Sequence, residues 1–233
     1  METVSMDIPT YADVLAAHER IEPYIHKTPV LTSRIIDEIT GANLFFKCEN
    51  LQKAGAFKAR GATNAVFGLD EQPARKGVAT HSSGNHGICL AYAASRRGIP
   101  CTVVMPRTAP QAKKDAVRGY GATVVECEPS TSSREAVFAE VVAKSGAEFV
   151  HPYNDPRVIA GQANCSKELL DQIPELDAVV APIGGGGMVS GTCLTLSHLQ
   201  PTTRIFAAEP EGSVAIFLLL LRYCHFSVHN WVR

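Results

Sequence analysis

Apolar and polar positions alternate along this chain with two periods, which predicts strands separated by helices. Val14, Ala17 and Ile21 recur at helical spacing, and Thr10 with Asp13 before them resembles a capping box. Short apolar runs of strand length then follow along the chain, at residues 44–48, 78–80, 101–105, 123–127, 178–182 and 204–208. Two predicted helices cover about 87–97 and 110–118. A third is opened by Ser132 and Glu135, which form a second capping box, and a fourth starts at about Met188.

This order of elements predicts an α/β fold. Strands that are joined by helices of this length pair in parallel. The segment from 101 to 127 is compact enough to form one strand–helix–strand unit. We therefore expect a small domain at 78–148, inserted in a large domain formed by residues 1–77 and 149–233.

The last twenty residues depart from this pattern. No acidic residue follows Glu211, and the apolar run from Val214 to Leu221 leads into mixed aromatic and histidine side chains. Glu209 lies just after a predicted strand, where an α/β sheet normally continues. We therefore expect the large domain to be incomplete at its C-terminal side. The apolar run is far shorter than the roughly 20 residues of a membrane-spanning helix, which favours a buried segment and no membrane partner.

Composition narrows the class of protein. Hydrophobic residues make up 45% and charged residues 19% of the 233 residues, which is typical of a globular protein. The net charge of -1 gives no electrostatic basis for nucleic-acid binding. Seven cysteines with no CxxC pair indicate reduced thiols rather than disulfides or a zinc site. With no signal or transit peptide pattern at the start, these features predict a cytoplasmic protein.

Lys58 is the first candidate for chemistry. It lies near the start of a predicted helix, between Phe57 and a series of small residues. Such surroundings lower the pKa of a lysine, whose free amine can then attack a carbonyl and form a Schiff base. An exposed helical lysine is the alternative, and this segment alone leaves both open.

Two polar or glycine-rich loops follow strands and precede helices. The run of residues 81–87, His-Ser-Ser-Gly-Asn-His-Gly, groups hydroxyl, amide and helix N-terminal N–H groups that suit a carboxylate. Gly184 to Gly187 allow the backbone N–H groups to surround a phosphate at a helix N-terminus. They match neither GxGxxG with a downstream acidic residue nor GxxxxGK[ST], so dinucleotide and P-loop sites are disfavoured. A capped polar loop and a flexible turn are the structural alternatives.

The order of these three segments resembles the fold-type II pyridoxal-phosphate enzymes, in particular the serine racemase and serine/threonine dehydratase family. The similar segments lie between about residues 11 and 210: 28–33, 46–49, 57–58, 60–62, 80–87, 120–122 and 127–129. The resemblance implies a tryptophan synthase β-like fold with parallel sheets flanked by helices in two domains. It also implies pyridoxal 5'-phosphate as cofactor and serine or threonine as substrate, and it is compatible with a homodimer.

The resemblance also implies roles for individual residues. Lys58 would hold the cofactor and act as base on one face of the substrate Cα, and Ser83 would be the acid/base on the other face. The substrate carboxylate would be held by Ser82, Ser83, Asn85 and His86. Phe57 would pack on the pyridine ring, and Asn85 would also reach the phenolic oxygen. The phosphate would be bound by Gly184, Gly185, Gly186 and Gly187, with Met188 beside them.

Some positions depart from the family pattern. Ala56 stands where serine is usual, and Gln162-Ala163-Asn164 replaces Gln-Gly-Thr. Glu209 matches a glutamate that helps to bind Mg2+ or Ca2+, but the expected aspartate is absent, with Ala215 nearby. A surface carboxylate is the alternative role of Glu209. Nothing matches the Ser-Gly-Gly motif that contacts the pyridine nitrogen in this family.

Three functions are therefore in competition. The leading prediction is a pyridoxal-phosphate-dependent serine racemase with accompanying serine dehydratase activity, which eliminates water and releases ammonia. The second is a threonine or 3-hydroxyaspartate dehydratase that uses the same site. The third, of another class, is a truncated splice or frameshift product that binds cofactor with weak or no activity.

Overall fold

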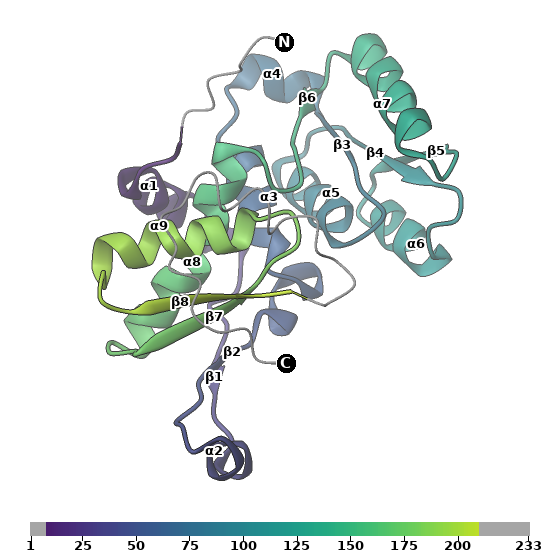
Figure 1. Cartoon of the computed structure of the whole chain (residues 1–233). Coiled ribbons are helices and arrows are strands. Elements are labelled where there is room, and N and C mark those ends of the chain that lie inside the picture. The colour runs from purple at the N-terminus through teal and green to yellow at the C-terminus, as the bar shows by residue number, and fades with distance from the viewer. Residues whose placement is uncertain (1–7, 210–233) are drawn as a thin grey trace.

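The structure is a computed structural model that describes residues 8–209, and it has the predicted α/β architecture. Figure 1 shows a four-stranded parallel sheet on one side of the molecule and a two-stranded parallel sheet on the other. The first sheet has the order β5-β4-β3-β6 and consists of β3 (Val78–His81), β4 (Cys101–Pro106), β5 (Thr123–Cys127) and β6 (Glu148–Phe149). The second sheet pairs β7 (Ala178–Pro182) with β8 (Arg204–Ala208).

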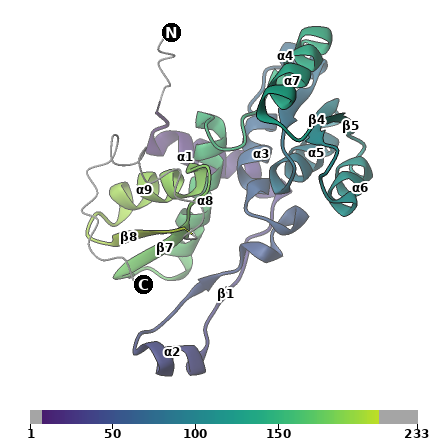
Figure 2. The same cartoon turned by 45° about the vertical axis from the view of Figure 1, so that its right-hand side comes forward.

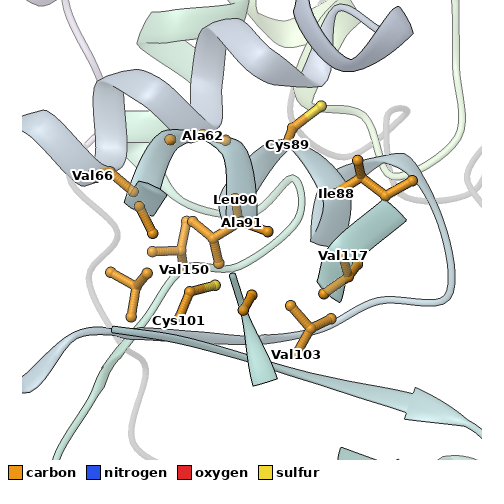
Figure 3. Close-up of a cluster of buried hydrophobic side chains, with 14 of the residues drawn as sticks. Ala62, Val66, Ile88, Cys89, Leu90, Ala91, Cys101, Val103, Val117 and Val150 are labelled. Atoms are coloured by element: carbon orange, nitrogen blue, oxygen red, sulfur yellow. The ribbon is translucent and has the colours of Figure 1, made fainter. Parts of the chain in front are cut away.

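Helices cover both faces of the four-stranded sheet. Helices α5 (Asn85–Arg97) and α6 (Gln111–Gly119) lie side by side on one face, and α7 (Thr131–Ser145) packs on the other (Figure 1). A cluster of buried side chains joins the sheet to α5 and also to α3 (Lys58–Phe67), as Figure 3 shows for Val103, Leu90 and Val66. The core of this sheet therefore continues into a helix that precedes residue 78. The division into domains at 78–148 stays a prediction.

Four helices pack together between the two sheets. The longest, α8 (Pro156–Gln172), contacts α3, α9 (Gly187–Leu199) and α1 (Tyr11–Ile21). Gly61 of α3 and Gly161 of α8 meet so closely that a Cβ on Gly161 would lie 2.5 Å from the Cα of Gly61. Glycine at both positions therefore permits the contact that sets α3, and with it Lys58, against α8.

A narrow arm extends from this body (Figures 1 and 2). It consists of β1 (Val30–Leu31), α2 (Arg34–Thr40) and β2 (Phe46–Lys47), and its two strands pair antiparallel. The predicted strand at 44–48 is thus limited to two residues, because only β1 lies beside it. The remaining elements are the helix α4 (Glu71–Lys76) and three short 3-10 turns, η1 (Glu22–Tyr24), η2 (Glu49–Leu51) and η3 (Lys53–Gly55).

One predicted capping box is confirmed and the other is wrong. The Thr10 hydroxyl accepts a hydrogen bond from the Asp13 N–H, and the Asp13 carboxylate accepts one from the Thr10 N–H. In the second case Ser130, not Ser132, caps the helix, because its side chain accepts from the Ser133 N–H.

Residues 210–233 lie outside the described part, and the predictions for Val214 to Leu221 and Ala215 fall there. Within residues 8–209, no helix combines the length and apolar character needed to span a bilayer.

Candidate functional site

Lys58 is the first residue of α3 and is partly buried. Its Nζ donates a hydrogen bond to the Pro152 carbonyl oxygen at 2.6 Å and lies 5.2 Å from the centre of the Phe57 ring. Burial lowers the pKa of the Lys58 ammonium to about 8. The alternative of an ordinary exposed lysine is therefore excluded, and the amine is available as a nucleophile or base near neutral pH.

A buried ion network fixes the helix that carries Lys58. Arg60, on the same turn of α3, is fully buried and donates hydrogen bonds to Glu49 at 2.7 and 2.8 Å and to Glu168 at 2.8 and 2.9 Å. Lys47 donates to the same Glu168 carboxylate at 2.9 Å. These partners outweigh desolvation, so the pKa of the Arg60 guanidinium is raised and it remains charged. The first turn of α3 is thus tied to α8.

The 81–87 loop begins at the carboxyl end of β3 and leads into α5. Gly84 is the N-cap residue, and no side chain of the described residues caps this helix, so its first N–H groups point outward without an intrahelical acceptor. Ser83 and Asn85 are exposed, and the Ser82 hydroxyl accepts from the Gly84 N–H at 3.3 Å. The Asn85 Oδ1 accepts from the Lys113 ammonium at 2.8 Å, which leaves the Asn85 amide N–H groups available as donors.

His86 is placed differently from the expectation that it binds the substrate carboxylate. Its ring is buried, its Nε2 donates to the Val150 carbonyl at 3.1 Å, and its Nδ1 has no partner among residues 8–209. Burial, with the nearby Lys58 charge, lowers the pKa of His86 to about 3, so the ring is neutral. This neutral ring offers no charge to a carboxylate, and the role of His86 in substrate binding stays a prediction.

The glycine loop follows β7 and ends at the N-terminus of α9. Gly186 is the N-cap residue with φ of 89°, in the left-handed region that glycine adopts without strain, and no described side chain caps this helix either. A Cβ on Gly185 would lie 2.0 Å from the Tyr153 ring, whereas one on Gly184 would meet nothing within 4 Å. Met188 is the second residue of α9. The loop therefore offers backbone N–H groups rather than side chains.

Residues 151–154 join Lys58 to the glycine loop. The Pro152 carbonyl accepts from Lys58, and the next residue, Tyr153, lies against Gly185 and Gly187. Neither residue was predicted from the sequence. Their signal was positional, because His-Pro-Tyr-Asn follows β6 at the same carboxyl edge that carries the 81–87 loop.

Arg134 of α7 is a third residue of this region that was not predicted from the sequence. Its Nε is buried without a hydrogen-bond partner in the described part of the chain. Its charge helps burial to lower the pKa of His81, at the end of β3, so the guanidinium is close to the start of the 81–87 loop. A buried guanidinium N–H without a described partner near the start of this loop favours an additional anion there.

The predicted cation site gains no support from neighbouring ligands. Within residues 8–209, no three His, Cys, Asp or Glu side chains group as metal ligands do. The Glu209 Oε1 is buried and has no hydrogen-bond partner among these residues. The chain continues directly from Glu209 into residues outside the described part. The role of Glu209 in binding Mg2+ or Ca2+ therefore stays a prediction.

The described residues fit a cofactor that carries both an aldehyde and a phosphate. An amine with a pKa of about 8 suits reaction with the aldehyde. The uncapped N-terminus of α9, with side chains excluded at Gly185, suits the phosphate. The second uncapped helix, α5, is close enough to Lys58 that the Lys58 charge acts on His86 and Cys89, and it suits a substrate carboxylate.

Known proteins resemble this chain over most of its length. Residues 21–224 match the family described as "Pyridoxal-phosphate dependent enzyme". The chain is 72% identical over 206 residues to the beta-hydroxyaspartate dehydratase of Paracoccus denitrificans (strain Pd 1222), covering 88% of this chain and 65% of that protein. It is 53% identical over 205 residues to the serine racemase of Arabidopsis thaliana, covering 87% of this chain and 62% of that protein. The chain thus spans less than two thirds of the length of either relative. The crystal structure of serine racemase from Dictyostelium discoideum has a TM-score of 0.89 at 50% identity, over 92% of this chain and 70% of that chain.

Proposed function

The chain belongs to the family of pyridoxal-phosphate-dependent enzymes, and we propose that it is a dehydratase acting on a β-hydroxy α-amino acid, with β-hydroxyaspartate as the preferred substrate. The reaction removes the Cα proton and expels the β-hydroxyl group as water. Hydrolysis of the resulting enamine then releases ammonia and a 2-oxo acid. Water is thus lost and regained, and no oxidant or reductant is needed.

The observation that carries this proposal is the state of Lys58. Its pKa is lowered to about 8 by burial, and one of its N–H groups is held by the Pro152 carbonyl. The lone pair of the unprotonated amine is then free to attack a carbonyl carbon and later to take the substrate Cα proton. When bound, the cofactor supplies the electron sink that stabilises the charge left at Cα.

The other residues of the site bind and orient. The first-turn N–H groups of α5, with Ser82 and the amide of Asn85, bind the substrate carboxylate. Phe57 packs beside the reacting lysine, and Gly184 to Gly187 with α9 bind the cofactor phosphate. In this arrangement the two anionic groups occupy two helix N-termini, and Lys58 reacts between them.

Two observations support the preference for β-hydroxyaspartate. The relative that carries this substrate in its name shares 72% of the aligned residues, against 53% for the Arabidopsis serine racemase. Arg134 offers an unpaired buried N–H near the 81–87 loop, which suits the second carboxylate that β-hydroxyaspartate has and serine lacks.

Racemisation of serine is the second candidate, and Ser83 favours it. This serine is exposed at the loop before α5, and among residues 8–209 its hydroxyl has no hydrogen-bond partner. A racemase needs a group that returns a proton from the face opposite the lysine. Ser83 is available for this role.

Borohydride reduction tests the cofactor assignment. The chain is incubated with pyridoxal phosphate, reduced, digested and mapped by mass spectrometry. We expect a single labelled peptide with the cofactor on Lys58, and no labelling of it in Lys58→Ala. Cofactor fixed on another lysine in the wild-type chain would refute the assignment.

Arg134 provides the test of substrate class. We expect Arg134→Met to raise the KM for β-hydroxyaspartate by about tenfold or more, because a hydrogen bond to a charged group contributes about 1.5–3 kcal/mol. The KM for L-serine should change little. Equal changes for both substrates, measured as 2-oxo acid formation, would contradict a second carboxylate site at Arg134.

A further inference from the structure

His151 organises the turn between β6 and α8. Its Nδ1 accepts hydrogen bonds from two backbone N–H groups, of Tyr153 at 3.3 Å and of Asn154 at 2.9 Å. Only an unprotonated Nδ1 accepts hydrogen bonds, since both ring nitrogens of a charged imidazole are donors. The turn therefore requires neutral His151 with its proton on Nε2.

This turn supports both parts of the proposed cofactor site. Its Pro152 carbonyl accepts the hydrogen bond from Lys58 at 2.6 Å. Its Tyr153 ring lies where a Cβ on Gly185 would be 2.0 Å away, and its backbone lies 3.0 Å from the corresponding position on Gly187. A change in the turn would thus reach the reacting amine and the glycine loop together.

The surroundings of His151 keep the ring neutral. Its ring contacts Phe149 with centres 5.5 Å apart, Tyr153 at 4.6 Å and His81 at 6.2 Å. Burial lowers the pKa of His151, and the charges of His81 and Lys58 lower it further, while the Asp155 carboxylate acts in the opposite direction. The ordinary value of 6.5 is therefore an upper bound for this histidine in the folded chain.

We propose that His151 is a positioning residue of the site, whose neutral Nδ1 holds the 151–154 turn so that Pro152 orients Lys58 and Tyr153 shapes the glycine loop. The inference rests on the proposed function for what Lys58 and the glycine loop bind. His151 itself does not touch the reacting atoms; it acts through Pro152 and Tyr153.

The proposal has a pH signature. A histidine whose pKa is lower in the folded chain than in the unfolded chain stabilises the folded arrangement fully above 6.5, and the stabilisation is lost as the pH falls below that value. Protonation of the His151 Nδ1 then removes the acceptor for the hydrogen bonds from the Tyr153 and Asn154 N–H groups. Cofactor retention should therefore weaken on the acid side because the turn opens.

Two variants separate the acceptor from the ring. His151→Phe keeps an aromatic ring against Phe149 and Tyr153 but removes the acceptor. His151→Asn removes the ring but keeps an acceptor, because an asparagine side chain commonly accepts from the backbone N–H two residues on. Circular dichroism and thermal melting of each apo-protein establish that it is folded before any comparison.

The first readout is the pH dependence of Lys58 labelling in the apo-protein, measured by mass spectrometry with an amine-reactive reagent. The wild-type midpoint should lie near 8. In His151→Phe the opened turn admits water, so the midpoint should rise toward the ordinary lysine value by about one unit. In His151→Asn it should stay near the wild-type midpoint. An unchanged midpoint in His151→Phe would overturn the proposal.

The second readout is the affinity for pyridoxal phosphate at pH 8 and pH 6. Wild type should bind pyridoxal phosphate more weakly at pH 6 than at pH 8. At pH 8, His151→Phe should bind it about five- to tenfold more weakly than wild type, in line with the loss of about 1–1.4 kcal/mol. His151→Asn should lose less affinity than wild type when the pH is lowered from 8 to 6. Two results would refute the acceptor role of His151. In the first, His151→Asn behaves like His151→Phe in both readouts. In the second, His151→Phe does not fold and His151→Asn retains the wild-type pH response.

The labelling readout needs no cofactor, so it still tests His151 if borohydride mapping of the wild-type chain refutes Lys58 as the attachment site.

Discussion

The N-termini of α5 and α9 resemble each other in backbone and differ in side chains. Each follows a parallel strand, each has a glycine as N-cap residue, and neither is capped by a described side chain. The loop before α9 consists of glycines, whereas the loop before α5 carries Ser82 and Ser83 and leads into Asn85. A phosphate that stays in place needs only N–H groups and the helix dipole. A substrate that must be selected and deprotonated needs hydroxyl and amide groups as well.

Each N-terminus is also shaped by a residue from another part of the chain. Tyr153 lies against the glycine loop and excludes a side chain at Gly185. Lys113 of α6 holds the Asn85 amide in one orientation. We therefore expect a side chain added at a glycine to weaken binding at the α9 site. At the α5 site, we expect the loss of a hydroxyl or amide group to have this effect.

Removal of the Ser83 hydroxyl should give the largest effect. We expect Ser83→Ala to lower the racemisation of L-serine by about 10²- to 10⁴-fold, the usual contribution of a general acid or base. Elimination should fall far less, because it can begin with Lys58 alone. Chiral analysis of serine and assay of the 2-oxo acid measure the two reactions in parallel.

Ser82→Ala is the matched control for this comparison. The Ser82 hydroxyl accepts the Gly84 N–H and belongs to the proposed carboxylate site, so both reactions should weaken together. Equal losses of both reactions in Ser83→Ala, at normal cofactor content, would assign Ser83 a general binding role and remove racemisation as a candidate function.

A methyl group in the glycine loop should give the next largest effect. In Gly185→Ala the new Cβ meets the Tyr153 ring, and overpacking of this kind costs about 1–3 kcal/mol, or about 5- to 150-fold in affinity for pyridoxal phosphate. Gly184→Ala should lose less, because its Cβ meets nothing within 4 Å. Absorbance titration measures both. Equal affinities of the two variants would mean that Tyr153 does not shape the loop.

The smallest effect is expected at Lys113. Lys113→Met removes the donor to Asn85 Oδ1 and should raise the KM of the amino-acid substrate by about fivefold, since a net hydrogen bond contributes about 1 kcal/mol. The kcat should change little. Lys113→Gln keeps a donor and should recover part of the loss. A fall in kcat with constant KM would place Lys113 in the chemical step instead.

Local signals in the sequence were sufficient for the strands that lead to the site. The predictions at 123–127, 178–182 and 204–208 match β5, β7 and β8 to the residue, because short apolar runs between turn residues mark strands. The glycine run and the 81–87 run were recognised for the same reason, since their composition is unusual over only a few positions.

The contacts that complete the site were not predictable in this way. Helix α8 was missed because Pro156 and Gly161 interrupt the helical pattern, although proline is favoured at the first turn and Asp155 caps it. The pairing of Arg60 with Glu168 joins residues more than a hundred positions apart. Pro152 and His86 likewise acquire their roles from tertiary packing: one approaches Lys58, and the other turns into the core.

The order of the two candidate reactions also differs from the sequence expectation. The motifs around Lys58 and residues 80–87 favoured racemisation of serine, although dehydratases share most of them. Our proposal puts dehydration first because of the higher overall identity to a dehydratase and because the unpaired Arg134 Nε suits a second substrate carboxylate. Shared motifs specify the cofactor chemistry, and the residues around them specify the substrate.

Comparison of pyridoxal phosphate with pyridoxal, which lacks the phosphate, tests most directly whether the α9 loop is the phosphate site. Their dissociation constants are measured on the wild-type chain and on Gly185→Ala. If the glycine loop binds the phosphate, Gly185→Ala should lose affinity for pyridoxal phosphate but bind pyridoxal as the wild type does. The dissociation constant of pyridoxal divided by that of pyridoxal phosphate should then fall toward one. An equal loss of affinity for both compounds would contradict the assignment of the α9 N-terminus as the phosphate site.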